Sequence, residues 1–433
     1  MKRLSKSYSV MCVLLSAGFA SAVATVSTNT VAGFWSDASR WSTGVPTQTD
    51  DAVLAASSNA VATIISNLNA SARSLVLSNG NSNSSLQFPD GGSLTLYGSE
   101  QIAGKGTIKS GSAARSGSLL IAQTNTLLAG SVLNVVSIDV FSLTVSRNSG
   151  TAVFTINSNQ NFSAVNCLVG NGGTGAGGYL TLAGGQLSLS QYLTLGNDNT
   201  DGGTFVLNGG ELIARMGIRG GDKTNSAFSL FIFNDGRISS SNMTATNRAF
   251  SALSPLNIQL AGTGVHEFNT AAGASVTMEA TARLIDKPGE KGTLQKTGVA
   301  VLNLNGTNSY SGGTVVSNGT LAVKADGGAG TGDIRVGTAA LSLSGGAAND
   351  YLNDGAKLIL QGTSALYLGF AGTDTVSAVS LDGGSSWLAA GVYDAAALDV
   401  MGTGFYSGAG HLNVTNTPGS VAVPSNDAGI WGT

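Results

Sequence analysis

The sequence predicts an all-β fold, a single-stranded right-handed parallel β-helix with about 25 residues in each coil. Three features lead to this prediction: a repeat at that spacing, short runs in which apolar and polar residues alternate, and a high glycine content. Glycine contributes 61 of the 433 residues and proline only six, which is typical of short strands joined by many turns. Apolar residues make up 42% of the chain, too many for a disordered protein.

The repeat is clearest between residues 178–197 and 203–222, where equivalent positions are 25 residues apart. The matching positions are Leu182 with Leu207, Gly184-Gly185 with Gly209-Gly210, Leu187 with Leu212, Leu193 with Ile218, and Gly196 with Gly221. The same spacing aligns Phe162 with Leu187 and links Leu143, Leu168 and Leu193, and a spacing of 26 aligns Leu212 with Ile238. A propeller would need blades of about 40–50 residues with their own signature, and a β-sandwich needs no fixed spacing.

Runs such as Tyr179–Leu182 are too short to bury much surface in an isolated hairpin. Stacked on the next repeat, each run bonds to its equivalent about 4.8 Å away along the axis, and the inward side chains form one continuous core. Glycine pairs supply the positive φ that corners need. Cys167 is the one cysteine beyond the leader, so no intramolecular disulfide is expected, and we predict that it is a buried small apolar residue.

Residues 1–24 have the pattern of a signal peptide, which predicts export from the cell. Lys2, Arg3 and Lys6 form a positive start, and an apolar stretch over 10–19 leads to small residues at 20–24 that suit cleavage. The alternative is an N-terminal membrane anchor, but the apolar stretch is too short to span a bilayer. No later segment has the length and apolar character of a transmembrane helix.

Residues 292–323 contain four ordered elements: Lys296-Thr297-Gly298, Leu302–Leu304, an Asn-x-Tyr-Ser-Gly-Gly-Thr turn at 308–314, and Gly319–Leu321. This pattern closely resembles the autotransporter-associated β-strand repeat of bacterial secreted and surface proteins. The resemblance implies one coil of a passenger-type β-helix and no particular reaction. Val299-Ala300 departs from the family's usual glycine. We expect the inward residues to be Leu294, Val301, Leu304, Val315 and Leu321.

Two further segments resemble parts of large bacterial proteins that carry this repeat: 35–54 resembles their entry segment, and 365–414 resembles their closing segment. We therefore expect a cap over 25–60, the β-helix over 61–364, closing coils with a second cap over 365–415, and a disordered tail over 416–433. Phe34, Trp35 and Trp41 are expected to cover the first coil. Residues 385–398, around Trp387 and Tyr393, are expected to cover the last coil and to allow a short helical turn. Neither an autotransporter barrel nor a complete sorting tail is expected, because only Val423-Pro424 of such a tail is recognisable.

The sequence predicts no catalytic, cofactor-binding or metal-ligating residues. The best charged grouping, Asp198, Asp201 and Asp222 with Arg219 and Lys223, is expected to be a solvated turn rather than a catalytic or Ca²⁺ site. Asp50-Asp51 are expected to help cap the helix rather than to bind a cation. His266 and His411, the only histidines, lack a nearby metal-ligand partner and are expected at the surface or at strand edges. The run Gly170–Gly178 precedes a strand and lacks a P-loop lysine, so it is expected to be a turn.

These observations favour a non-catalytic extracellular or cell-surface protein with a structural or adhesive role. Its expected partners are glycans, the cell envelope or neighbouring copies of itself. A net charge of −3 without a basic face gives no case for nucleic acid. The main alternative is a polysaccharide-active lyase or hydrolase on the same scaffold, which would place acids, or acids with Arg or Lys, on adjacent coils. A carbohydrate-binding module would show exposed aromatic residues one coil apart, and no such row is visible at 25-residue spacing.

Overall fold

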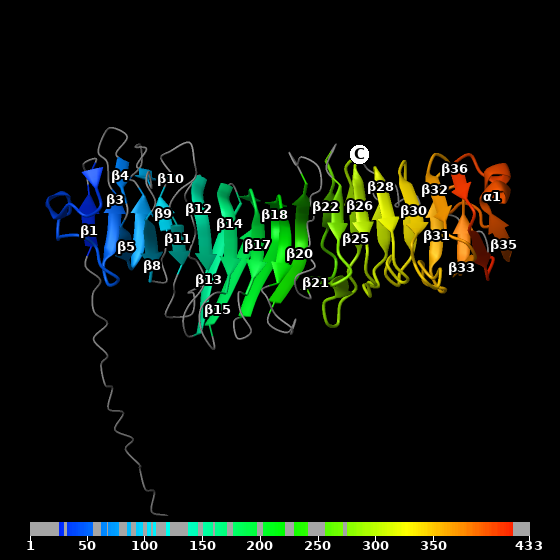
Figure 1. Cartoon of the computed structure of the whole chain (residues 1–433), viewed down its shortest axis with the longest axis horizontal. Coiled ribbons are helices and arrows are strands. Elements are labelled where there is room, and N and C mark those ends of the chain that lie inside the picture. The colour runs from blue at the N-terminus through cyan, green and yellow to red at the C-terminus, as the bar shows by residue number, and fades with distance from the viewer. Residues whose placement is uncertain are drawn as a thin grey trace, which may run out of the picture.

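The chain is wound into a parallel β-helix, as predicted (Figure 1). The computed structural model describes residues 26–29, 33–54, 62–66, 68–77, 85–87, 92–97, 102–104, 107–109, 118–121, 137–145, 150–158, 161–170, 176–196, 202–220, 229–240, 256–271 and 275–418. Along one face the strands follow each other from β2 to β34, each paired in parallel with its equivalent on the next coil. They are β2 Gly33–Phe34, β4 Ala62–Ile64, β7 Ser85–Gln87, β10 Thr107–Lys109, β12 Ser137–Val145, β14 Asn161–Val169, β16 Gln186–Leu189, β18 Gly202–Ala214, β20 Ser229–Ser239, β22 His266–Asn269, β25 Leu294–Thr297, β27 Thr314–Val316, β29 Ile334–Val336, β31 Lys357–Leu360 and β34 Ala378–Ser380.

Shorter ladders form the other faces. One is β13 Gly150–Asn157 and β15 Ala176–Ala183, continued through β18 and β20 to β21 Leu256–Leu260 and β24 Ala282–Asp286. Another is β5 Asn69–Ala72, β8 Ser93–Leu96 and β11 Ser118–Ile121, continued through β12 and β14 to β17 Tyr192–Leu195 and β19 Gly217–Gly220. Separate sheets contain β1 Val26–Asn29, β3 Asp51–Leu54, β6 Ser74–Leu77 and β9 Ile102–Gly104, and β23 Val276–Met278, β26 Val301–Leu304, β28 Thr320–Val323, β30 Ala340–Ser344, β32 Ala365–Gly369 and β36 Phe405–Gly408.

The predicted stacking of the central repeats is confirmed. Leu187 pairs in register with Phe162 on one side and with Leu212 on the other, and Leu212 pairs with Ile238. All four side chains are buried. The alternation of inward and outward residues therefore carries an apolar column from coil to coil.

One part of the predicted alignment is wrong by a single residue. Leu143 pairs with Cys167, and Cys167 pairs with Leu193, so Leu168 is not in this column. The spacing here is 24 and then 26 residues instead of 25 twice. Because side chains alternate between the two faces of a strand, the slip points Cys167 inward, and its side chain is completely buried. The prediction that Cys167 is a small core residue is confirmed.

Coil length varies more than the central repeats suggest. Register partners are 30 residues apart between Ile238 and Phe268, but only 20 apart between Lys296 and Val316. The strands keep their alignment across these changes, so the turns must absorb the difference.

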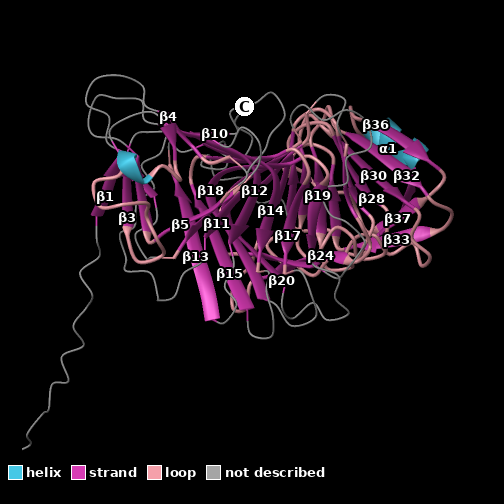
Figure 2. Cartoon of the chain, turned by 60° about the vertical axis from the view of Figure 1, so that its left-hand side comes forward, coloured by secondary structure: helices cyan, strands magenta, loops and turns pink. Residues whose placement is uncertain are grey.

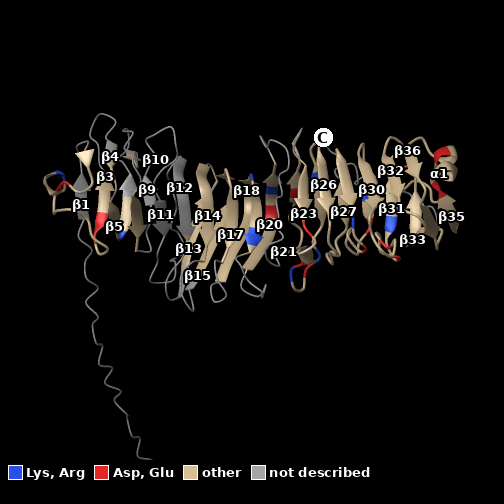
Figure 3. Cartoon of the chain, in the orientation of Figure 1, with Lys and Arg blue, Asp and Glu red and all other residues tan. Residues whose placement is uncertain are grey.

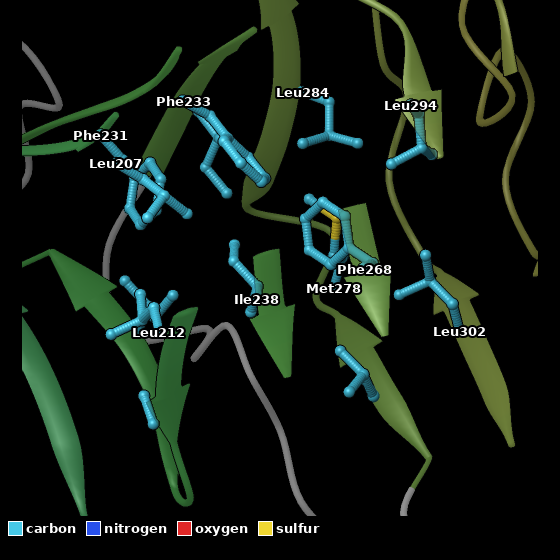
Figure 4. Close-up of a cluster of buried hydrophobic side chains, with 14 of the residues drawn as sticks. Leu207, Leu212, Phe231, Phe233, Ile238, Phe268, Met278, Leu284, Leu294 and Leu302 are labelled. Atoms are coloured by element: carbon cyan, nitrogen blue, oxygen red, sulfur yellow. The ribbon is translucent and has the colours of Figure 1, made fainter. Parts of the chain in front are cut away.

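The interior is a continuous apolar column. Figure 4 shows part of it, where side chains from successive coils point toward each other across the lumen. Phe231 and Phe233 lie at an aromatic centroid distance of 6.0 Å, and Phe233 lies at the same distance from Phe268 on the next coil. Edge-to-face pairs of this kind add to the stability that burial alone supplies.

Helical segments cover the two ends (Figure 2). At the first coil, Trp35 and Trp41 are buried in an edge-to-face pair beside the 3₁₀ helix Ala38–Arg40, and the Trp41 indole donates to the Trp35 carbonyl at 2.8 Å. Phe34 does not share in this cover, because 54% of it is exposed. It points away since it neighbours the inward Trp35 in an extended segment.

The last coil is covered by α1, Ala395–Met401, which follows β35, Gly391–Asp394. The helical turn therefore lies at the end of the predicted segment 385–398 and continues beyond it. Asp394 caps the helix by accepting from Ala397 N at 2.7 Å. Strand β35 pairs antiparallel with β37, His411–Val414, which is parallel to β33, Thr373–Val376. Asn416 still bonds to Ser377, so the predicted tail begins too early, and residues 419–433 lie outside the described part.

No helix in the described part of the chain is long and apolar enough to cross a membrane.

The glycine pairs of the central repeat make one corner of the coil, as expected. Gly210 has a φ of +76°, and a Cβ added to it would lie 2.4 Å from the carbonyl oxygen of Gly185 on the preceding coil. Both the backbone conformation and the close approach of two coils therefore require glycine there.

Replacing Gly210 with alanine should destabilise the protein more than the matched change at Gly289. Gly289 also has positive φ, at +83°, but open space surrounds its missing Cβ. We expect Gly289→Ala to lower the unfolding free energy by about 1–2 kcal/mol through backbone strain, and Gly210→Ala to cost about 1–3 kcal/mol more through the clash. Guanidinium unfolding followed by circular dichroism measures both. Equal losses would show that coil-to-coil contact does not matter at this corner.

Candidate functional site

The segment 292–323 is one coil held by polar side chains in its interior. Lys296 continues the apolar column, because its register partners are Phe268 and Val316, and it is completely buried. Its Nζ donates to the carbonyl oxygens of Thr297, Gly298 and Asn318 at 2.7, 2.8 and 2.9 Å. The ammonium thus joins the turn after its own strand to the turn of the next coil.

Asn308 makes a similar link on another corner. Its Oδ1 accepts from Leu284 N at 2.8 Å, and its Nδ2 donates to the Gly328 carbonyl at 2.7 Å. These partners lie on the preceding and following coils, so one buried amide joins three levels of the stack. Satisfying buried backbone groups in this way avoids a cost of about 1–3 kcal/mol for each group.

Tyr310 fills the same corner. It is completely buried, its hydroxyl lies 2.6 Å from the Thr314 hydroxyl, and Thr314 Oγ1 donates to the Ala329 carbonyl at 3.1 Å. A Cβ on Gly330 would lie 2.8 Å from the tyrosine ring, so the next coil packs directly on it. The signature residues of the segment therefore bind neighbouring coils.

Residues 294–323 match the family model of the passenger-associated-transport-repeat. This segment is a passenger-associated-transport-repeat. The match confirms the resemblance of the segment to an autotransporter passenger repeat, and the transport repeat has the β-solenoid shape that such a repeat requires. No curated protein and no solved structure matches the chain.

Two expected inward residues of the transport repeat are wrong. Val301 and Val315 are only partly buried, whereas Leu302, Thr314 and Val316 are buried. In each strand the alternation is shifted by one position, which exchanges the inner and outer faces. Leu294, Leu304 and Leu321 are buried as expected.

The histidine expectation is wrong for His266. This residue is completely buried, with Nδ1 2.7 Å from the Thr293 carbonyl and Nε2 3.0 Å from the Ala261 carbonyl. Burial lowers the pKa of the imidazole. Its ring packs edge-to-face on Phe233, at a centroid distance of 5.1 Å. His411 is half-buried in β37, close to the last coil.

Other predicted residues have structural contacts. Asp50 accepts from Thr47 N at 2.9 Å, and Asp51 binds Arg73, so both hold turns near the first coil. The Arg219 guanidinium lies over the Tyr192 ring, 4.2 Å from its centroid. Gly170 has positive φ and β15 begins at Ala176, in agreement with a turn before a strand. Asp198, Asp201, Asp222 and Lys223 lie outside the described residues, as does much of Gly170–Gly178.

A polar pocket of about 490 Å³ lies where the turns of one corner lengthen. Between register partners, two residues separate Phe233 from Gly236, five separate Leu260 from His266, and seven separate Asp286 from Leu294. The overhanging turns form the pocket walls, and Figure 3 shows acidic and basic residues together on the longest one. The lining residues are Asn234, Asp235, Ala261, Gly262, Thr263, Gly264, Val265, Lys287 and Glu290.

The pocket walls are held by specific bonds. Val265 N donates to Asp235 Oδ1 at 2.9 Å, and Lys287 Nζ lies 2.7 Å from Glu290 Oε1. Sequence analysis missed this grouping of acids and lysine on adjacent coils because unequal turns offset the residues by 52 and 55 positions, not 25. In the described part of the chain, no group of three or more His, Cys, Asp or Glu is placed to hold a metal ion.

An exposed aromatic pair also escaped the search at fixed spacing. Tyr367 on β32 and Phe405 on β36 are exposed on neighbouring strands, although 38 residues separate them. The intervening chain forms the C-terminal cap, which lengthens this coil.

A buried carboxyl lies at the last coil, in a position that parallels Asn308. Asp374 Oδ2 accepts from Leu352 N on the preceding coil at 3.2 Å, but its Oδ1 is buried without a hydrogen-bond partner. Burial raises the pKa of Asp374 to about 7, and the charge of Asp350 raises it further against opposing backbone hydrogen bonds. Asp326, Asp350 and Asp374 are each 24 residues apart.

The buried lysine should make stability rise with pH. Burial lowers the pKa of Lys296 to about 8, from 10.5 in the unfolded chain, so between these values the unfolded state binds more protons and folding gains with rising pH. We expect the stability of the wild type relative to Lys296→Met to increase from pH 7.5 to about pH 10. Thermal melts of both proteins across that range measure it. The exposed Lys324→Met is the control, and parallel curves for all three would refute the expectation.

Asp374 should act in the opposite direction. Its folded pKa of about 7 exceeds the unfolded value of 3.8, so the folded state holds the proton more tightly and stability falls as pH rises from about 4 to 7. Asp374→Asn should therefore be more stable than the wild type above pH 7, and the advantage should shrink in acid. Asp326→Asn is the matched control, because backbone hydrogen bonds lower the pKa of Asp326 and give the reverse sign. An advantage for Asp374→Asn that is the same at pH 5 and pH 8 would contradict the assignment.

Proposed function

We propose that the protein is an exported, non-catalytic β-helix that serves as a structural or adhesive element at the cell surface or outside the cell. The observation that carries the proposal is that the transport repeat is one coil of a continuous stack. The signal-peptide pattern of residues 1–24 supports export.

The outer side chains support a structural role, because they bond from one coil to the next. Gln186 Nε2 donates to Glu211 Oε2 at 2.8 Å, and Arg237 Nε lies 2.8 Å from Glu267 Oε2. Groups that satisfy each other within the rod stiffen it, and a stiff rod holds a binding surface away from the point of attachment. We propose glycans, the cell envelope or neighbouring copies as partners.

A polysaccharide-active enzyme is the second candidate, and the polar pocket is the observation that favours it. Asp235, Lys287 and Glu290 come from different coils and line one cavity. Paired carboxylates, or a carboxylate with a base, are what glycosidic cleavage needs.

Surface display can be tested by expressing the full chain in a Gram-negative host with an epitope tag at the exposed Thr403. External protease should remove the epitope from intact cells while a periplasmic marker survives, or the protein should be found in the medium. Deletion of residues 2–24 should retain the protein inside the cell. Retention of the full chain in the cytoplasm would refute the proposal.

The enzyme alternative predicts product formation that depends on the pocket acids. We expect no release of reducing ends or unsaturated sugars from a panel of neutral and acidic polysaccharides by the purified protein. Turnover that Asp235→Asn and Glu290→Gln both abolish would replace the non-catalytic proposal. Turnover that survives both changes would point to a contaminant.

A further inference from the structure

The polar pocket is built for a ligand rich in hydroxyl groups. Its volume of about 490 Å³ lies within the range of about 300–1,000 Å³ that is common for small-molecule sites. No aromatic residue lines it, and Val265 is the one large apolar side chain in the lining. A ligand must therefore be held mainly by hydrogen bonds.

The lining offers both acceptors and donors. Asp235 and Glu290 are acceptors, Lys287 is a donor, and the Thr263 hydroxyl is both. Asn234 adds an unused acceptor: its Nδ2 donates to Asn208 Oδ1 at 3.3 Å, while its Oδ1 is buried without a partner. A hydroxyl group can donate to one of these groups and accept from another, which a simple anion or cation cannot do.

The charges select against acidic ligands. Two carboxylates face one ammonium, and Lys287 is already paired with Glu290. An anionic group entering the pocket would lose its hydration and meet a net negative charge. A neutral sugar meets no such cost.

The walls are fixed before any ligand arrives. The buried His266 holds the first overhanging turn through Ala261 and Thr293, and Asp286 Oδ1 accepts from Gly292 N at 2.8 Å to close the second turn. Gly262 leaves room for Glu290, whose Oε2 would lie 2.7 Å from an added Cβ. Fixed walls reduce the entropy that binding must overcome.

We infer that this pocket binds a neutral glycan through its hydroxyl groups, and so names the ligand class for the proposed adhesive function, on which the inference rests. Asp235, Lys287 and Glu290 contact the sugar hydroxyls, and Thr263 lies at the rim.

The mature full-length protein should bind neutral oligosaccharides on a glycan array and ignore sialylated and uronic-acid members. Calorimetry with the best neutral oligosaccharide then tests the pocket. Thr263→Trp should abolish binding by filling the cavity, and Glu290→Gln and Asp235→Asn should each weaken it by about tenfold or more. Thr281→Trp, an equally exposed threonine outside the pocket, should bind like the wild type. Circular dichroism melts confirm that each variant is folded.

Three outcomes would overturn the inference: no neutral glycan binds, only acidic glycans bind, or Thr263→Trp binds as tightly as Thr281→Trp. In each case the surface-display experiment decides separately whether the proposed function holds. A protein that is displayed and adhesive but insensitive to Thr263→Trp would keep that function with a different binding surface.

Discussion

The backbone ladder between successive coils is the constraint on which the rest of this structure depends. Each strand satisfies its N–H and C=O groups on the coils before and after it, so every inward side chain lies directly between its equivalents. Apolar residues fulfil that requirement along most of the column. Lys296 fulfils it in another way, because its stem packs in the column while its ammonium binds three carbonyls at the corner.

The same constraint explains the transport repeat in chemical terms. Lys296, Asn308 and Tyr310 point into the stack, where they join turns of different coils, and are not displayed to a partner. Their role is to align coils whose turns differ in length. Asp374 occupies a comparable position at the last coil, but a carboxylate cannot donate as an amide can. Burial therefore raises its pKa, and the closing coil responds to pH.

Regular coils provide the scaffold, and irregular turns provide the chemistry. Where the turns stay short, the outer surface is a flat array of small polar residues that bond to each other. Where the corner grows from two to seven residues, the chain overhangs its own surface and encloses a polar pocket. The charged residues of that corner lie on different coils, and the β-helix brings them together without disturbing the core.

Alternation and repeat spacing alone determined the fold class, the stacking of Leu187 on Leu212, the burial of Cys167 and the transport repeat. They did so because side-chain period and coil period are local properties of the chain. Only the tertiary structure decided that Cys167 rather than Leu168 faces inward, that His266 is buried, and that Asp235 meets Glu290 at one pocket. The physical reason is that turn length is free to vary while strand register is not. A one-residue difference in a turn exchanges the faces of a strand, and a longer one changes which residues become neighbours.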